Sequence, residues 1–307
     1  MSNNSQMLAG KVVIVTGAGG GVGEGVAKLA ASYGASVLVN DLGVSLGGEG
    51  GDAGPAQRVA DEINAAGGRA AASFRTIATW DSAHAIVQDA LDAFGRLDAL
   101  VNNAGIVRDA MFHKMTQSDW DTVRNVNLDG YFYMSRAAAD PFRAQGGGCY
   151  VHMTSTSGLI GNLGQTNYGA AKAGVAGLSK NIAVDMAKFN VRSNCIAPFA
   201  FTRMVDSIPD TNARNRERLE GLKRLKSDKV AALAVALMCD EASDISGQVF
   251  GSRNNEIMLF SQPRPVRTMH TSEGWTPQAC IATAFPAFKP SMYPLDKSGD
   301  VFTWDPV

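Results

Sequence analysis

The chain has 307 residues, of which 45% are hydrophobic and 19% charged, and its formal net charge is −1. This composition is typical of a globular protein, and the length allows one large α/β domain or two small ones. The balanced charge argues against the strongly basic surface that binds nucleic acid or an anionic membrane.

The four cysteines and four histidines are too scattered to predict disulfides or a metal site. We therefore expect reduced thiols and no metal. The N-terminal MSNNSQM lacks the apolar core of a signal peptide, and the final WDPV is not a peroxisomal signal. No apolar run is long enough to span a bilayer, so we predict a cytoplasmic location.

The first predicted unit is a strand, a glycine-rich turn and a helix. The run KVVIVT at residues 11–16 predicts a buried strand, and Gly17, Gly21 and Gly23 follow it. Glycines there let backbone amides approach a pyrophosphate at a helix N-terminus. A plain tight turn is the alternative, but the position between strand and helix favours dinucleotide binding.

A second strand, residues 36–40, ends at Asp41. An acidic residue in this position can accept hydrogen bonds from both ribose hydroxyls of adenosine and repels a 2′-phosphate. The glycine-rich stretch 42–54 contains no Lys or Arg, so we expect no local cation for that phosphate and predict NAD over NADP. A helix-capping or turn aspartate is the alternative.

Strand and helix patterns alternate along most of the remaining chain. Further strands are predicted at 70–75, 97–101, from 151, at 191–196 (ended by Pro198) and at 248–251, and helices from 54, at 81–94, from 116 and at 229–240. This alternation predicts a Rossmann-like α/β fold, a doubly wound parallel sheet with helices on both faces. We expect one dinucleotide-binding and catalytic domain, residues 1–251, with a C-terminal extension, residues 252–307, packed on it.

The helix that starts near residue 116 carries two informative features. Thr116 to Asp119 has the spacing of a capping box. Further on, the sequence NVNLDG at 125–130 interrupts helix propensity. Such an interruption exposes a backbone carbonyl that could hold a water. A merely tolerated polar stretch is the alternative.

The stretch 151–174, VHMTSTSGLIGNLGQTNYGAAKAG, contains the candidate chemistry. Tyr168 and Lys172 lie four positions apart on one helix face, and Ser155 follows the preceding strand. A nearby ammonium favours the phenolate and lowers the pKa of a tyrosine, so Tyr168 can exchange a proton with an alcohol or carbonyl. Ser155 can hydrogen-bond the same oxygen. The alternative is an unrelated Tyr and Lys on a solvated helix face.

Together these pieces resemble a classical short-chain dehydrogenase/reductase over residues 9–252. The resemblance rests on the Thr16-Gly17-x3-Gly21-x-Gly23 turn, Asn102-Asn103-Ala104-Gly105, Asn127, Ser155, Tyr168-x3-Lys172, Asn194 and Pro198. It implies a catalytic tetrad of Asn127, Ser155, Tyr168 and Lys172, with a relay water on Asn127 and the nicotinamide ribose on Lys172. It also implies an NAD site made by Gly17, Gly21, Val22, Gly23, Asp41, Asn103, Ala104, Gly105, Tyr168, Lys172, Pro198 and Thr202.

A narrower likeness is to the (3R)-hydroxyacyl-CoA dehydrogenase unit of peroxisomal multifunctional enzyme type 2 and its bacterial relatives. It rests on VNDLG at 39–43, MTS at 153–155, IAP at 196–198 with Arg203-Met204, and the tail after Gly251. Two departures stand out. Residues 76–79 read TIAT where classical members place an adenine-binding Asp, and Phe199 replaces the usual Gly after Pro198.

The resemblance implies NAD-dependent oxidation of a secondary alcohol, and a bulky steroid-derived or long-chain (3R)-hydroxyacyl-CoA fits best. The predicted substrate contacts are Ser155, Tyr168, Phe199, Phe201 and Met204, with Met111, Phe112 and Met115 flanking the mouth. Such apolar residues are also ordinary packing. Coenzyme A phosphates could meet Arg108, Lys114, Arg203, Lys223 or Arg224, which are otherwise surface cations.

Two other functions remain open. One is a dehydrogenase of free hydroxysteroids or other secondary alcohols, and the other is a catalytically silent NAD-binding scaffold on the same fold. The Gly/Ala-rich helix from Tyr168 onward permits close helix approach, and the resemblance implies pairing through such helices into dimers or tetramers. The tail after Ser252 could block one tetramer face, so we predict a homodimer, with a tetramer as the alternative.

Overall fold

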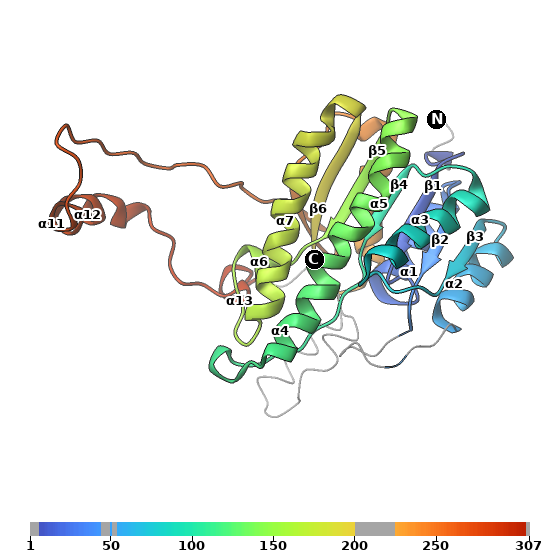
Figure 1. Ribbon diagram of the computed structural model, residues 1–307, viewed down its shortest axis with the longest axis horizontal. Helices are drawn as coiled ribbons and strands as arrows, with labels where there is room; N and C mark the ends of the chain where they lie inside the picture. The colour runs from blue at the N-terminus through green and yellow to red at the C-terminus, as the bar shows by residue number, and fades with distance from the viewer. Residues whose placement is uncertain (1–5, 44–49, 51–53, 200–224, 305–307) are drawn as a thin grey trace.

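An eight-stranded sheet with the order β3-β2-β1-β4-β5-β6-β7-β8 forms the centre of the chain (Figure 1). The computed structural model describes residues 6–43, 50, 54–199 and 225–304. Strands β1 to β7 are parallel, and β8 is antiparallel to β7. The strands are β1 (Val12–Thr16), β2 (Ser36–Asn40), β3 (Arg69–Ser73), β4 (Ala99–Asn102), β5 (Gly148–Met153), β6 (Val191–Phe199), β7 (Val249–Arg253) and β8 (Glu256–Leu259).

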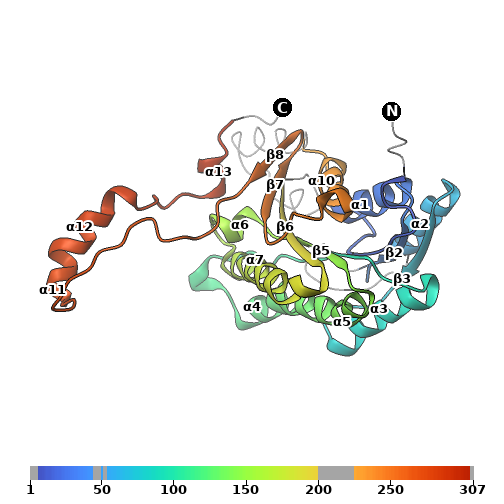
Figure 2. The same ribbon diagram turned by 90° about the horizontal axis from the view of Figure 1, so that it is seen from above.

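Helices cover both faces of this sheet, as Figure 2 shows. One layer contains α1 (Gly21–Ser32), α2 (Gly54–Ala65) and α10 (Asp228–Met238). The other contains α3 (Trp80–Phe94), α4 (Gln117–Arg124), α5 (Gly130–Gln145) and α7 (Thr166–Met186), with the short α6 (Thr156–Leu159) before α7. The predicted doubly wound α/β fold is confirmed.

Successive side chains of β1 point alternately towards the two helix layers. Val13 and Val15 belong to the core beneath α1 and α10, whereas Val12 and Ile14 belong to the core beneath α3 and α5. Because both faces are buried, every position of the strand is apolar except Thr16, and this explains the continuous β-branched run in the sequence.

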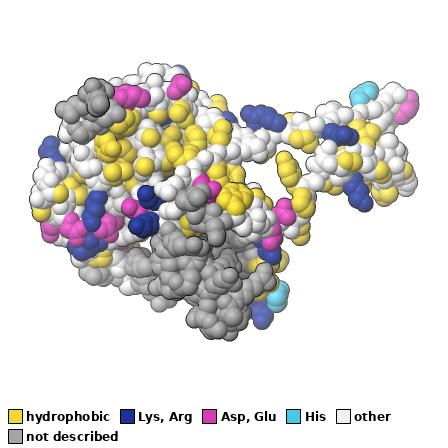
Figure 3. Space-filling view, turned by 180° about the vertical axis from the view of Figure 1, so that it is seen from behind, with side chains coloured by type: hydrophobic (Ala, Val, Ile, Leu, Met, Phe, Trp, Pro, Cys, Tyr) yellow, Lys and Arg dark blue, Asp and Glu magenta, His cyan; other side chains and the backbone are white. Residues whose placement is uncertain are grey.

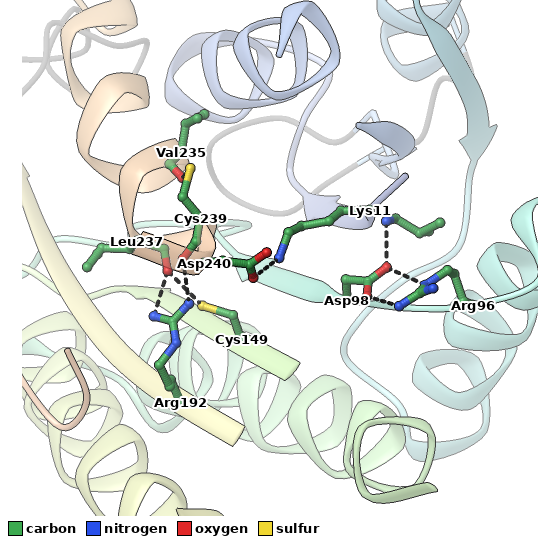
Figure 4. A network of polar contacts seen from close by, with 10 residues as sticks. Lys11, Arg96, Asp98, Cys149, Arg192, Val235, Leu237, Cys239 and Asp240 are labelled. Carbon is green, nitrogen blue, oxygen red and sulfur yellow. Dashed lines mark hydrogen bonds and ion pairs between the residues drawn. The ribbon is translucent and has the colours of Figure 1, made fainter. Parts of the chain in front are cut away.

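Polar contacts tie the helices to the edge of the sheet where the parallel strands begin (Figure 4). Arg192, at the start of β6, donates to the carbonyl oxygens of Leu237 (2.8 Å) and Cys239 (3.2 Å) at the end of α10. The Leu237 carbonyl belongs to the last turn of α10, whereas the Cys239 carbonyl also accepts from the Ala242 N–H (3.2 Å), so the guanidinium caps the helix chiefly at Leu237. At the same edge, Asp98 accepts from the backbone N–H of Val12 at 2.9 Å.

The prediction that Pro198 ends the sixth strand is wrong, because β6 continues to Phe199 and Pro198 pairs with Ser252 of β7. On β6, the N–H of Cys195 donates towards β7, and the carbonyl of Ile196 accepts from the N–H of Thr154. Strand alternation puts the nitrogen of Pro198 on the same side as Ile196. There β5 has already ended at Met153, so no ladder bond is lost.

The predicted interruption of the long helix is confirmed. The Thr116 hydroxyl and the Asp119 carboxylate form the expected capping box at the start of α4. The backbone then widens into a π-helical turn over Asn125–Asp129 before α5 begins. Such turns are frequent at functional sites.

The C-terminal segment begins inside the sheet and then leaves it. The proposed boundary at residue 251 falls within β7, and a two-residue turn at Asn254 leads to β8, which the sequence reading missed. The chain then forms an arm that carries α11 (Pro277–Ala279) and α12 (Phe285–Phe288) away from the body, and returns at α13 (Ser298–Val301) (Figures 1 and 2).

Several contacts anchor the returning end of this arm. The Ser298 N–H donates to the carbonyl of Gly161 at 2.9 Å, and Arg253 donates to the carbonyl of Trp304. Ile281 and Phe285 are exposed on the arm. Figure 3 shows hydrophobic side chains along the surface of the arm. Among the described helices, none has the length and hydropathy needed to cross a bilayer.

Candidate active site

The turn between β1 and α1 is too tight for side chains at two positions. A Cβ on Gly17, whose φ is +63°, would lie 2.6 Å from the Cα of Ala104, and one on Gly23 would lie 2.3 Å from the carbonyl oxygen of Gly17. Neither approach is sterically tolerable, so glycine is required at both positions. Gly21 also has positive φ, at 58°, and begins α1, with the buried Val22 next to it.

Asn103 joins this turn to the end of β4. Its side-chain nitrogen donates to the carbonyls of Thr16 and Gly17, both at 3.0 Å, and its backbone N–H donates to the Thr16 hydroxyl at 3.0 Å. Strands β1 and β4 are neighbours at which the strand order reverses. This is the switch point where open α/β sheets bind ligands, as the sequence predicts.

Asp41 lies beside the same turn. Its carboxylate accepts from the backbone N–H groups of Gly19 (2.8 Å) and Gly43 (2.7 Å). A cavity of about 360 Å³ opens here, lined by Gly19, Gly20, Gly21, Glu24, Asp41, Gly43, Pro55 and Arg58. The expectation of no local cation is wrong, because α2 brings Arg58 to this cavity from outside the glycine-rich stretch.

The cavity and turn fit the adenosine and phosphate groups of a dinucleotide. The N-cap residue of α1, Gly20, provides no side-chain cap, so the first-turn amides of this helix remain available to a phosphate. Asp41 offers carboxylate oxygens to ribose hydroxyls. Glycine at position 19 keeps the entrance open, since a Cβ there would lie 2.8 Å from Asp41 Oδ2.

Lys172 lies at the other end of this edge, buried beneath the sheet's carboxyl ends. Its ammonium donates to the carbonyl of Met153 (2.8 Å) and to the hydroxyl of Tyr131 (2.9 Å). Burial lowers the pKa of Lys172 to about 7. Tyr131 is fully buried on α5 and was not identified from the sequence, since only the packing of α5 against α7 brings it to Lys172.

Tyr168 lies close to Lys172 and Ser155, the two residues predicted to act with it. The ammonium of Lys172 is 5.7 Å from the centre of its ring, and Ser155 hydrogen-bonds its phenol. Burial raises the pKa of Tyr168 to about 12, although the Ser155 hydrogen bond opposes the shift. The expected lowering by Lys172 is therefore not found, because the loss of solvation on burial dominates the pKa of Tyr168.

Ser155 belongs to a chain of hydrogen bonds that leads to the surface. Its hydroxyl donates to Ser157 Oγ (3.2 Å), which donates to Gln165 Oε1 (2.7 Å). The amide nitrogen of Gln165 donates in turn to Asp109 Oδ2 at 3.0 Å. The Ser155 oxygen also accepts from the Ser157 N–H (3.1 Å), which leaves one lone pair for a donor such as the Tyr168 phenol. The sequence reading missed Ser157, Gln165 and Asp109.

Asn127 lies within the π-helical turn and is fully buried. Its side chain accepts from the N–H of Ile106 (3.1 Å) and donates to the carbonyls of Ile106 (2.8 Å) and Val123 (3.0 Å). A Cβ on Gly105 would lie 2.6 Å from its Oδ1, which explains the glycine in the Asn102–Gly105 motif. Asn127 thus fixes the loop beside Lys172, and its role in holding a water stays a prediction.

The structure describes only some of the remaining residues that were predicted to contact the substrate or cofactor. Pro198 and Phe199 end β6, and the Phe199 ring packs edge-on against Phe302 of the C-terminal segment, with ring centres 4.7 Å apart. Met111 and Phe112 are exposed beside the site. The proposed contacts that lie outside the described residues are Phe201, Thr202, Arg203, Met204, Lys223 and Arg224.

Within the part of the chain that the structure describes, no three His, Cys, Asp or Glu side chains cluster as metal ligands, and all four cysteines are free thiols.

Comparisons with known proteins agree with this geometry. A family model described as short chain dehydrogenase matches residues 11–213. A hydroxyacyl-CoA dehydrogenase of Mycobacterium tuberculosis is 35% identical and covers 92% of this chain and 90% of its own length. Peroxisomal multifunctional enzyme type 2 of Mus musculus is 40% identical over 78% of this chain, which spans only 31% of that enzyme.

A solved structure is also similar, that of a 7α-hydroxysteroid dehydrogenase complexed with NADH and 7-oxo glycochenodeoxycholic acid. It is 32% identical with a TM-score of 0.74, over 83% of this chain and 98% of that one. The glycine-rich turn at the switch point, the Ser155–Tyr168–Lys172 cluster and the family match agree, and the chain belongs to the short-chain dehydrogenase family.

Proposed function

We propose that this protein oxidises the 3-hydroxyl group of a bulky (3R)-hydroxyacyl-CoA, steroid-derived or long-chain, to the 3-oxoacyl-CoA, with NAD as hydride acceptor. As a family member it is an oxidoreductase that acts on CH–OH groups. The observation that carries the proposal is the meeting of Ser155, Tyr168 and Lys172 at the sheet edge that also holds the glycine-rich turn.

NAD is supported by Asp41 in the adenosine cavity and by the similar hydroxysteroid dehydrogenase, whose structure contains NADH. Gly17, Gly21, Val22 and Gly23 would hold the pyrophosphate, and Asn103, Ala104 and Gly105 would support the turn. Lys172, Tyr168, Pro198 and Thr202 would meet the nicotinamide half. When bound there, NAD would supply the hydride acceptor.

Tyr168 would exchange the proton of the substrate oxygen, and Ser155 would orient that oxygen. With a pKa near 12, the phenol is protonated at neutral pH and is available to give its proton to the substrate oxygen in the reductive direction. In the oxidative direction a phenolate is required. The Lys172 ammonium, 5.7 Å from the ring, stabilises this phenolate when it is protonated.

The acyl-CoA assignment is supported by the two relatives named for hydroxyacyl-CoA and multifunctional peroxisomal enzymes. Exposed Met111 and Phe112 beside the site suit an apolar acyl group. A second candidate, oxidation of free hydroxysteroids or other secondary alcohols, is favoured by the similarity to the 7α-hydroxysteroid dehydrogenase. A catalytically silent scaffold remains the third candidate, and the half-buried Tyr168 beside the buried Lys172 argues against it.

The decisive experiment compares turnover of (3R)-hydroxyacyl-CoA thioesters with that of their free acids and of hydroxysteroids, each with NAD. We expect the thioesters to have the highest kcat/KM. Tyr168→Phe should lower kcat by at least about a hundredfold, the usual contribution of a general acid or base, while NADH binding persists. Equal turnover by Tyr168→Phe would disprove the proposed role, and preference for a free steroid would select the second candidate.

We also propose that the protein is a homodimer and acts in the cytoplasm. The exposed side of α7 carries small residues, so two such helices can approach closely.

A further inference from the structure

Arg58 lies at the wall of the adenosine cavity with all four of its terminal N–H groups engaged. Nη1 donates to Glu24 Oε1 (3.2 Å) and Glu62 Oε1 (2.7 Å), and Nη2 donates to Glu24 Oε2 (2.9 Å) and to the carbonyl of Gly19 (3.0 Å). A guanidinium has four N–H bonds on its terminal nitrogens. Neither of these nitrogens has a donor left for a ligand.

The two carboxylates that hold Arg58 come from different helices. Glu24 lies in the first turn of α1 and Glu62 on α2, and Lys28 bridges them with contacts of 2.5 Å to each. The hydrogen bond from Arg58 is the main cause that lowers the pKa of Glu24, so this carboxylate is ionised at neutral pH. The four side chains form a charge-balanced cluster that fixes the guanidinium between α1 and α2.

Among the described residues, the lining of the cavity is net negative. It contains the carboxylates of Glu24 and Asp41 and the guanidinium of Arg58. A 2′-phosphate in this cavity would meet two carboxylates, and the guanidinium could bind it only by giving up contacts with Glu24. A nucleotide with a free 2′-hydroxyl faces no such cost, since Asp41 can accept from that hydroxyl.

We propose that Glu24 and Glu62 act as a clamp that withholds Arg58 from the nucleotide and, together with Asp41, selects NAD over NADP. This inference rests on the proposed function and identifies what determines its cofactor specificity. Asp41 alone is then not sufficient for the selection. The cavity already contains the arginine that a 2′-phosphate requires, so release of the clamp should open it to NADP.

The test measures the affinities for NADH and NADPH directly. Binding is monitored through nicotinamide fluorescence in the absence of substrate. The first variant is Asp41→Asn alone. The double variant adds Glu24→Gln, and the triple variant adds Arg58→Met to both. We expect Asp41→Asn alone to keep a preference for NADH. Adding Glu24→Gln should tighten NADPH binding by at least about tenfold, as expected for a freed charge-assisted contact, with NADH changed less than about threefold. Arg58→Met should abolish this gain.

Two further variants complete the design. Glu62→Gln in the Asp41→Asn background loosens the clamp from the other helix. It should also tighten NADPH binding, by a smaller factor than Glu24→Gln does. Asp140→Asn, which releases Arg136 on α5 from a similar ion pair at 2.9 Å, is the matched control and should change neither affinity.

The inference is overturned if Asp41→Asn alone equalises the two affinities, if Glu24→Gln adds nothing, or if the gain survives Arg58→Met or appears in Asp140→Asn. Failure of the wild type to bind NADH would instead overturn the proposed function, and this inference with it. Binding of NADH by every variant, without the predicted change for NADPH, would overturn the clamp alone.

Discussion

At the scale of single residues, the environment of Lys172 is the most consequential feature of the site. The side chain is 3% exposed, and its ammonium has the Tyr131 hydroxyl and the Met153 carbonyl as acceptors. The Tyr131 ring centre also lies 4.4 Å from the ammonium, which adds a cation–π contact. These groups favour the charged form against the burial that lowers its pKa to about 7.

Tyr131→Phe should therefore shift the pH dependence of the reaction. The substitution keeps the ring but removes a hydrogen bond to an ammonium, so the pKa of Lys172 falls further and its charge is lost at lower pH. We expect the alkaline limb of kcat to move down by about one pH unit, since one unit corresponds to about 1.4 kcal/mol. The KM for NAD should change little. The measurement is a pH profile of kcat and KM.

Tyr150→Phe is the matched control for this shift. Tyr150 is another buried tyrosine, and its hydroxyl donates to the carbonyl of Ser135 at 2.8 Å rather than to Lys172. Its profile should keep the wild-type limb even if stability falls. An unshifted limb in Tyr131→Phe, or an equal shift in both variants, would contradict the assignment to Lys172.

At the scale of secondary-structure elements, the end of α10 depends on an arginine from a strand. Sequence gives α10 a clear apolar pattern but no glycine at its C-terminus, and Cys239 there is extended rather than left-handed. Arg192 replaces the usual backbone cap by donating to the Leu237 and Cys239 carbonyls (Figure 4). The cap joins the helix layer to β6 at the edge opposite the candidate active site.

Arg192→Met should lower the free energy of unfolding by about 1–3 kcal/mol, the cost of leaving a buried acceptor unpaired. The loss is limited by the weak donor Cys149 Sγ, 3.2 Å from the Leu237 carbonyl, and by the Ala242 N–H, 3.2 Å from the Cys239 carbonyl. Urea unfolding measures the change, and activity of the folded variant should remain. Arg143→Met, at an exposed position on α5, should stay within about 0.5 kcal/mol of wild type. Equal losses in the two variants would argue against a specific cap.

At the scale of the whole molecule, one outer face of α7 is available for association. Ala170, Ala173, Gly177, Asn181 and Val184 are exposed, and they recur every three or four residues along the helix. Buried residues of the same helix, such as Lys172 and Val175, face the sheet. The face that would meet a second copy therefore belongs to the helix that positions Tyr168 and Lys172.

Gly177→Arg should convert the proposed dimer into a monomer. A Cβ at Gly177 meets no atom within 4 Å in this chain, so the subunit can accept the side chain, whereas a closely packed second helix cannot. Light scattering should give twice the subunit mass for wild type and the subunit mass for the variant. Gly299→Arg, an equally open position on α13, should remain a dimer. A monomeric wild type would refute the dimer itself.

The sequence alone was enough for the features that depend on short-range order. Hydrophobic periodicity gave the alternating strands and helices, the glycine spacing gave the turn after β1, and the four-residue spacing put Tyr168 and Lys172 on one helix face. Each of these follows from backbone geometry over a few residues, so neighbours along the chain are sufficient to predict it. The strand ends, in particular that of β6 at Phe199, depended on where neighbouring strands stop.

Only the tertiary structure could bring Tyr131 to Lys172, Arg58 to the adenosine cavity, and Arg192 to the end of α10. The residues of each group lie far apart in the sequence and meet because helices pack on a common sheet. The pKa values of Tyr168 and Lys172 also depend on the tertiary structure, because they are governed by how much water the whole fold excludes from these groups. Burial and long-range contact are properties of the packed chain, and no local pattern of residues encodes them.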